Sequence, residues 1–296
     1  QDVSELVKDC GFGVFTGAIE NGGMVRGLCA KGLGDVSSKK MKHIEKTAKD
    51  YGAKGLAYIQ LKSDGTVKCP FSKFMSEEEL QALIQAMGGE TGDLLVFAAD
   101  KFKVVCDVLG ALRLKFAEEL NLLDKSEYRF VWITEFPLLE WSEEENRYTA
   151  MHHPFTRPKD SDLDKIDTDP ANCLADAYDI VLNGFELGGG SQRIYEEELQ
   201  DRAFKALGFT QERIDAQFGW FVDAFRYGAP PHAGFALGLD RFAMLLCGCD
   251  SLRDVIAFPK NTSATCPMSK APTPVDNDQL KDLGIEVTEY ESEENK

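Results

Sequence analysis

The sequence predicts a mixed α/β chain with two domains. Apolar runs of strand length alternate with segments of helical periodicity, and glycines separate many of them. The 296 residues correspond to about two domains of ordinary size. Apolar residues make up 43% and charged residues 28% of the chain, which is typical of a globular protein and argues against disorder.

The N-terminal elements begin with a helix over residues 3–8. Residues 14–18 and 24–29 are apolar runs of strand length, and the Asn21-Gly22-Gly23 turn between them predicts a hairpin. A basic helix over 39–51 then follows Ser38 and ends at Gly52.

Capping and stop signals delimit the next elements. Ser76 and Glu79 form a capping box, because each side chain can satisfy the free backbone N–H of the other residue. The helix that they open extends to Met87, and glycines stop it. The other predicted elements here are strands over 55–61 and 94–98 and a helix over 104–123.

The character of the sequence changes after Lys125, so we predict domains over 1–124 and 125–296. The second part mixes apolar strands, an acidic turn, a polar loop and two amphipathic helices. Its acidic end, 286–296, is predicted to fray. In chain order we predict a strand over 130–134, a turn over 142–147, a loop over 157–170, a strand over 177–185, helices over 195–207 and 218–227, a strand turning into a helix over 235–247, and a helix over 278–283.

Charge and cysteine usage restrict the possible partners and location. The formal net charge of −17 excludes a generally basic nucleic-acid coat, so any RNA contact must be local. The basic helix over 39–51 is one candidate, although a solvated face is the favoured interpretation. The eight cysteines form no Cys-x-x-Cys pair, and no apolar run approaches the ~20 residues of a membrane span. We therefore expect reduced thiols, a cytoplasmic location and no membrane partner.

His152 and His153 are half of the chain's four histidines and stand together before Pro154. Adjacent residues on a strand point to opposite faces, so both can line one pocket only if the backbone turns there. Pro154 makes such a turn plausible. One packed and one exposed histidine is the simpler interpretation of the pair alone.

Asp179, Glu186 and Arg193 are charged residues in or beside apolar segments. Buried charges need partners or a metal, and two facing carboxylates are commonly bridged by Mg²⁺ with a phosphate ligand. On a regular strand Asp179 and Glu186 would lie on opposite faces, so their convergence needs a bulge or bend, for which Asn183-Gly184 is the natural place. Plain salt bridges are the alternative.

Two glycine-containing stretches complete the candidates. The contiguous glycines 188–190 before Ser191 match neither a Walker A loop nor a dinucleotide fingerprint, and they would let a ligand approach bare backbone. Residues 234–242 are an apolar strand with small residues that leads into Asp240-Arg241 at the start of a helix. An arginine placed there offers a fixed fork of donors for phosphates.

Together these stretches resemble the C-terminal half of the class II aminoacyl-tRNA synthetases, and most closely the bacterial-type aspartyl-tRNA synthetase family. The stretch 228–241, Gly-Ala-Pro-Pro-His-Ala-Gly followed by a glycine-rich run and Asp-Arg, is similar to motif 3 in this family's version. Residues 1–124 resemble the GAD domain that the bacterial enzymes insert between motifs 2 and 3. Three other stretches are similar to the family in order and spacing: 150–156, 183–191 and 254–260. The implied fold is α/β, with a GAD domain and then the C-terminal part of an antiparallel-sheet catalytic domain.

The resemblance also implies the reaction and the roles of residues. Arg193 would bind the side-chain carboxylate of L-aspartate in a bidentate pair. Asp179 and Glu186 would hold Mg²⁺ on the phosphates of ATP, and Arg241 would contact the γ-phosphate. The aspartate carboxylate would attack the α-phosphate, giving aspartyl-adenylate and pyrophosphate before transfer to tRNA. The other implied binding residues are His152, His153 and Ser191 for aspartate, and Glu186, Gly238 and Asp240 for ATP.

The main departure from the family lies before residue 1. The anticodon-binding domain, the motif 1 dimer element and motif 2 with its α-phosphate arginine are expected there, so we expect a fragment that cannot form adenylate alone. The full-length enzyme is expected to be a homodimer. The sequence does not distinguish a family member for the aspartate tRNA from one that also serves the asparagine tRNA.

Two other functions are compatible with parts of the resemblance. GAD domains also occur in a subunit of a tRNA-dependent amidotransferase, so the chain could be a tRNA-binding accessory, against which motif 3 argues. It could also be a non-catalytic synthetase-like module, against which the retained Asp179, Glu186, Arg193 and Arg241 argue. Binding of ATP would discriminate between these functions.

Overall fold

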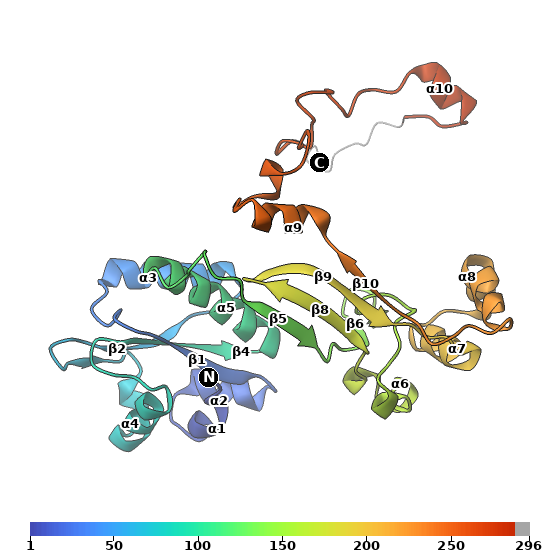
Figure 1. Cartoon of the computed structure of the whole chain (residues 1–296). Coiled ribbons are helices and arrows are strands. Elements are labelled where there is room, and N and C mark those ends of the chain that lie inside the picture. Colours follow the sequence, from blue (N-terminus) through green and yellow to red (C-terminus); the bar gives the residue numbers. More distant parts are fainter. Residues whose placement is uncertain (288–296) are drawn as a thin grey trace, which may run out of the picture. The chain divides into compact units, whose positions relative to one another are not determined.

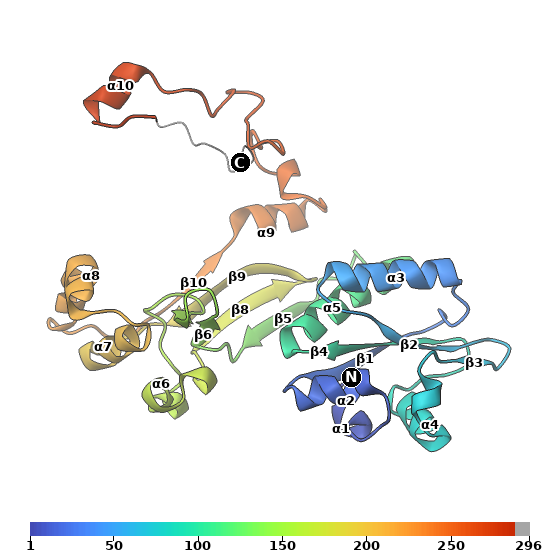
Figure 2. The same cartoon turned by 180° about the vertical axis from the view of Figure 1, so that it is seen from behind.

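The computed structural model describes residues 1–287 and shows two compact units (Figures 1 and 2). The first unit is Gln1–Glu127, and the second begins at Tyr128, close to the boundary that the sequence predicts. Both units mix helices with antiparallel sheets, so the predicted α/β class is confirmed. Most of the predicted acidic tail, 288–296, lies outside the described residues.

The first unit contains a four-stranded antiparallel sheet in the order β1-β4-β2-β3. Its strands are β1 Met24–Ala30, β2 Ala57–Leu61, β3 Val67–Lys68 and β4 Leu94–Asp100. Its helices are α1 Ser4–Val7, α2 Gly13–Glu20, α3 Ser38–Asp50, α4 Glu77–Ala86 and α5 Phe102–Glu119, with a 3₁₀ turn at Ser72–Phe74.

Helices cover both faces of this sheet, as Figure 1 shows. The helices α1, α2 and α4 enclose one apolar cluster, and α3 and α5 enclose the other. The central strand β4 contributes to both clusters, with Leu95 and Phe97 facing one and Leu94 and Val96 facing the other. Burial on both faces explains why β4 reads as a continuous apolar run rather than an alternating one.

The predicted strand over 14–18 and its hairpin are wrong, because this segment forms α2. Phe12, Phe15 and Ile19 are spaced by three and four residues, so a helix places all three against the same apolar cluster. The Asn21 side chain donates to the Gly17 carbonyl at 2.6 Å, and Gly22 has a positive φ of 73°. The Asn21-Gly22-Gly23 sequence therefore marks the C-terminal end of a helix and not the turn of a hairpin.

The capping signals of the first unit are largely confirmed. Ser76 and Glu79 form the predicted capping box at the start of α4. The helix α3 begins one residue earlier than predicted, with Ser37 rather than Ser38 as its N-cap. The helix α5 ends at Glu119, where Asn121 adopts a positive φ of 51°, four residues before the predicted end.

The second unit contains a four-stranded antiparallel sheet in the order β10-β9-β8-β5, and β6 and β7 form a separate hairpin. The strands are β5 Phe130–Thr134, β6 Leu139–Ser142, β7 Arg147–Ala150, β8 Ala177–Leu182, β9 Phe185–Gln192 and β10 Ala233–Leu237. The helices are α6 Lys165–Thr168, α7 Glu197–Ala206, α8 Gln211–Phe225, α9 Leu239–Leu246 and α10 Asn277–Asp282, with 3₁₀ turns at Asp160–Asp162, Pro170–Asn172 and Leu252–Asp254.

The predicted single strand over 177–185 is wrong, because it is a hairpin. The strand β8 ends at Leu182, and Asn183 and Gly184 form the turn into β9 with φ values of 50° and 86°. Two consecutive positive φ values are typical of a two-residue type I′ turn, for which Asn-Gly is the preferred sequence. The contiguous glycines 188–190 therefore lie inside β9.

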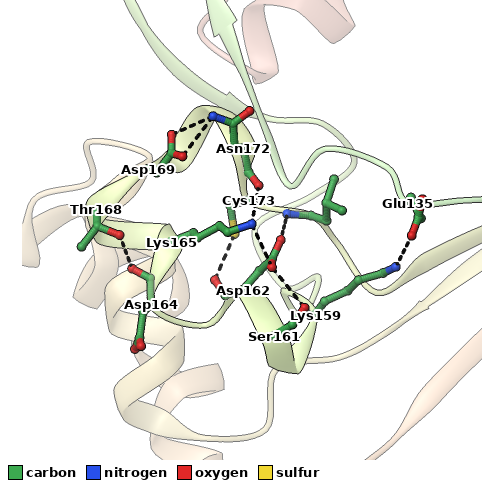
Figure 3. Close-up of polar contacts among 11 residues, drawn as sticks. Glu135, Lys159, Ser161, Asp162, Asp164, Lys165, Thr168, Asp169, Asn172 and Cys173 are labelled. Atoms are coloured by element: carbon green, nitrogen blue, oxygen red, sulfur yellow. Dashed lines mark hydrogen bonds and ion pairs between the residues drawn. The ribbon is translucent and has the colours of Figure 1, made fainter.

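The predicted polar loop over 157–170 is folded around a buried aspartate (Figure 3). Asp162 accepts hydrogen bonds from the Leu174 backbone N–H at 3.0 Å and from Ser161, and it pairs with Lys165 at 3.1 Å. These hydrogen bonds, that of Leu174 above all, lower the pKa of Asp162. At the start of the loop, the Arg157 N–H donates to the carbonyl of Gln192, the last residue of β9, at 2.9 Å, so the loop supports the end of β9 and is not a free connection.

Both outer strands of the second sheet carry exposed apolar side chains. All residues of β5 and β10 are exposed, and the exposed fraction of Trp132 is 57%. Within the described part of the chain the sheet ends at these two strands. No helix in residues 1–287 is long and apolar enough to cross a membrane.

Candidate functional site

A β-bulge brings Asp179 and Glu186 onto one face of the second sheet. Asp179 pairs with Gly189, but past the bulge at Ile180 and Val181 the register shifts, so that Val181 pairs with Glu186. Directly paired residues share a face, as do residues two apart on one strand, so Glu186 lies on the face of Asp179. Without the bulge, Leu187 would take its place. The convergence expected from sequence thus comes from the hairpin together with the bulge.

The three contiguous glycines fit two close approaches. A Cβ on Gly189 would lie 1.8 Å from Oδ1 of Asp179, so the absent side chain leaves room for that carboxylate across β9. A Cβ on Gly188 or Gly190 would lie 2.0 or 1.8 Å from a carbonyl oxygen of β10. The glycines therefore serve backbone packing and the Asp179 carboxylate. Their suggested role of exposing backbone to a ligand stays a prediction.

The Asp179–Glu186 pair has the electrostatics of a cation site. Burial, followed by repulsion from Glu186, raises the pKa of the Asp179 carboxyl. The nearby His152 partly offsets this rise. A divalent cation would relieve the repulsion, and the two carboxylates supply oxygen ligands that suit Mg²⁺. Among residues 1–287 no three acidic, His or Cys side chains gather as a metal site, so the other ligands would be substrate or water oxygens.

Arg241 joins this carboxylate pair from the helix α9. Its NH1 lies 3.2 Å from Oε1 of Glu186 and donates to the Glu186 carbonyl at 2.8 Å. Gly238 is the N-cap of α9, and its N–H donates to the Leu187 carbonyl at 2.7 Å, which fixes the start of the helix against β9. Asp240 lies exposed in the first turn of α9 and, within the described part of the chain, has no hydrogen bond to the other candidate residues.

Arg193 and His153 form the second half of the site. Arg193 follows β9 and pairs with Thr156 in an isolated β-bridge, and its backbone N–H donates to the His232 carbonyl at 2.9 Å. Its NH1 lies 3.1 Å from Nδ1 of His153. The Phe155 N–H also donates to Nδ1 of His153, at 3.2 Å. Since the guanidinium can only donate, Nδ1 of His153 is an acceptor and its proton lies on Nε2.

His153 is expected to remain neutral across the physiological pH range. Burial, then the charges of Arg193 and His152, lower its pKa from 6.5 to about 4. As the pH falls, the His153 ring takes up a proton in the unfolded chain near pH 6.5 but in the folded chain only near pH 4. The contribution of neutral His153 to the free energy of unfolding is therefore fully present above pH 6.5 and is lost as the pH falls toward 4. An NMR titration of the histidine rings, assigned with His153→Gln, measures this. A midpoint near 6.5 would contradict the arrangement.

His152 and Ser191 lie at the same face. The backbone turns after β7 ends at Ala150, so His152 and His153 are not on a strand. The ring of His152 packs edge-on against that of Phe136, with 4.9 Å between the ring centroids. Ser191 is two residues from Gly189 on β9 and so shares the Asp179 face. Its buried Oγ has no hydrogen-bond partner in the described structure. A ligand or a water is the expected partner of such a group.

The sequence did not single out the residues that support this site. Gln200 of α7 is fully buried, and its Nε2 donates to the Pro154 carbonyl at 2.8 Å, which ties down the histidine turn. Arg157 is buried and pairs with Glu196 at 2.5 Å and with Asp160 at 3.1 Å. The Gln200–Pro154 and Arg157–Glu196 contacts join segments distant in sequence, and a buried glutamine within a helical run carries no local signal of such a role.

Comparison with known proteins relates both units to one family. The family model described as tRNA synthetases class II (D, K and N) matches residues 28–262. The chain is 59% identical over 294 residues to an aspartate–tRNA(Asp/Asn) ligase of Lachnoclostridium phytofermentans. It is 58% identical over 293 residues to an aspartate–tRNA ligase of Agathobacter rectalis. The chain spans about half the length of these relatives: each match covers 99% of the chain and 49% of the relative.

A solved structure is similar over a smaller part. The aspartyl-tRNA synthetase of Entamoeba histolytica is 23% identical, with a TM-score of 0.38, and the match covers 64% of this chain and 32% of that one.

Proposed function

The chain belongs to the class II tRNA synthetases (D, K and N), and we propose that it is the C-terminal half of an aspartate–tRNA ligase. The observation that carries the proposal is that one face of the second sheet holds two neighbouring groups of charged side chains. Arg193, held by His153, offers a guanidinium for a carboxylate substrate. Asp179 and Glu186, with Arg241 beside them, offer a place for Mg²⁺ and phosphates.

Aspartate recognition rests on Arg193. Its fork of N–H donors would bind the two oxygens of the aspartate side chain, and the neutral amide of asparagine cannot reproduce that pairing. The neutral His153 accepts from the guanidinium and so aims it without removing its charge. The unpartnered Ser191 Oγ and the ring of His152 would contact the bound amino acid from the same face.

ATP binding rests on the other end of this face. Arg241 would release Glu186 to contact the γ-phosphate, and Asp179 with Glu186 would hold Mg²⁺ on the phosphate oxygens. The metal would neutralise phosphate charge as the aspartate carboxylate attacks the α-phosphate and pyrophosphate leaves. Gly238 and Asp240 would lie beside the nucleotide at the start of α9. No protein nucleophile is needed, since orientation and electrostatics would supply the acceleration.

The remaining parts of the proposal concern the whole enzyme. The first unit would be the GAD domain of the bacterial enzymes, tRNA would be the second substrate, and the full-length enzyme would be a cytoplasmic homodimer. Similarity over 99% of the chain to proteins named aspartate–tRNA ligases supports tRNA as the second substrate. Motif 3 and the assembled charges favour this function over an amidotransferase accessory or a non-catalytic module.

We expect this chain alone to show no aspartate-dependent exchange of pyrophosphate into ATP. The missing half should supply motif 2 and cover the exposed apolar strands β5 and β10. Co-expression with that half, taken from the 59% identical relative or the parent gene, should restore exchange and reduce aggregation. The measurement is exchange activity of the single half and of the pair.

Binding of ATP by the chain alone separates the alternatives. A fragment of a ligase should still bind MgATP, weakly, and Arg241→Ala should weaken that binding. Exchange by the chain alone would overturn the proposed dependence on the missing half. Failure of the reassembled pair to activate aspartate, with both halves folded, would overturn the proposed activity itself.

A further inference from the structure

The first unit contains a cavity of about 720 Å³ outside the site described above. It lies beside α2, the start of β2 and the segment at Pro70 and Phe71. Its volume is within the range of about 300–1,000 Å³ that small-ligand pockets occupy. None of the residues proposed for aspartate or ATP lines it.

Small residues on two elements make this space. The helix α2 packs against β1 and β4, and its Gly17 is part of the cavity wall. Gly55, two residues before β2, and Ala57, the first residue of that strand, also line the cavity. A Cβ on Gly17 or on Gly55 would meet nothing within 4 Å. The wall is thus open where ordinary side chains would have filled it, and apolar residues such as Phe71 line part of the remainder.

An unpaired stretch of strand edge borders the cavity. The N–H of Leu61 donates to the Asp93 carbonyl at 2.9 Å, toward β4, so by alternation the backbone groups of Tyr58 point away from β4. Leu56 directly precedes this strand. In the described structure, β3 pairs with β2 only at Gln60 and Leu61. The chain soon reaches Pro70, which has no N–H to continue a ladder. Among residues 1–287 no hydrogen bond reaches the backbone N–H or C=O of Tyr58 or Leu56, and both residues line the cavity.

Two lysines line the same cavity. The Lys54 side chain is 92% exposed and lies 3.6 Å from Asp100. Lys101 makes no ion pair to any described residue, and the Asp100 carboxylate accepts from its backbone N–H at 2.8 Å. The other acidic residue here, Glu45, is paired with Lys49 at 2.9 Å. A ligand carboxylate would thus find a free cation at Lys101.

We propose that this cavity binds the C-terminal end of a short extended peptide with an apolar last side chain. The peptide backbone would pair with Tyr58 and Leu56 by strand addition, the mode in which main-chain bonds give affinity and a pocket selects a side chain. The apolar side chain would fill the hollow between Gly17 and Ala57, and the carboxylate would face Lys101 and Lys54. Because Tyr58 and Leu56 are the only free residues at this edge in the described structure, the site takes two or three peptide residues rather than a long strand.

The test uses the full chain and acetyl-Gly-Gly-Leu, with its C-terminal amide as the matched peptide without the charge. Binding is followed by isothermal titration, and backbone NMR locates it through the amide signals of Leu56 and Tyr58. In the protein, Gly17→Leu fills the hollow, and Gly13→Leu is the control on the same helix, outside the cavity and with equally open space at its Cβ. Leucine has a better helix propensity than glycine, so neither change weakens α2.

The acid should bind with a dissociation constant in the millimolar range or better, and Gly17→Leu should weaken it at least about tenfold, with Gly13→Leu near wild type. The amide, or Lys101→Gln, should also weaken binding about tenfold. Equal binding of acid and amide, equal binding by Gly17→Leu and wild type, or no binding at about 5 mM peptide would each overturn the proposal. Thermal unfolding of each variant establishes that loss of binding is not loss of fold. None of these readouts depends on ligase activity.

Discussion

Arg193→Met is expected to lower kcat/KM for aspartate by about 10³-fold or more in the enzyme reassembled from this chain and its missing half. Such a loss corresponds to about 4 kcal/mol of transition-state stabilisation. Methionine keeps much of the length of the side chain but removes the guanidinium, so the substrate carboxylate would lie beside His153 without a cation. The KM for ATP should change little, because the proposed phosphate contacts lie at Arg241 and the Asp179–Glu186 pair.

Arg202→Met is the matched control for this prediction. Arg202 lies on α7 and donates to Asp167 at 2.7 Å, in a contact that supports the loop rather than the site. Arg193→Lys should recover part of the activity, since it restores the charge without the fork of donors. Equal losses for Arg193→Met and Arg202→Met, or a loss that appears in the KM for ATP alone, would contradict the assigned role.

Gly190→Ala is expected to destabilise the second unit by roughly 2–3 kcal/mol or more. The new Cβ would lie 1.8 Å from the carbonyl oxygen of Gly234 and 2.8 Å from its carbon. These are backbone atoms of the neighbouring strand and cannot rotate away, so β9 and β10 must separate or twist. Urea unfolding of the chain, followed by tryptophan fluorescence, measures the loss through the transition midpoint.

Gly234→Ala provides the internal control in the same strand pair. A Cβ there meets nothing within 4 Å, so the substitution should change stability by only about 0.5 kcal/mol. If both alanine variants unfold at the wild-type urea concentration, the strands are further apart than the structure places them. If both are equally destabilised, loss of glycine rather than the close approach would be the cause.

Local signals predicted much of the fold because they act over a few residues. The capping box at Ser76 and Glu79 forms as expected, and β5 occupies the predicted 130–134. The strand prediction for 14–18 is wrong because a mainly apolar stretch of five residues suits either a strand or a helix. Packing of Phe15 in the apolar cluster that contains Leu95 and Phe97 decides between them. The turn at Asn183-Gly184 was located correctly as a break, but its hairpin geometry was not predicted.

The sequence by itself determined the fold class, and its motifs indicated the family and the residue types that carry chemistry, because hydrophobic periodicity, caps and motif spacing are properties of the chain alone. Only the tertiary structure decided how those residues meet. The bulge at Ile180 turns Glu186 toward Asp179, and the bridge between Arg193 and Thr156 places a guanidinium on the ring of His153. The cavity beside β2 also depends on packing between distant elements. Register, burial and ring protonation arise from contacts between segments far apart in the sequence, which no local pattern encodes.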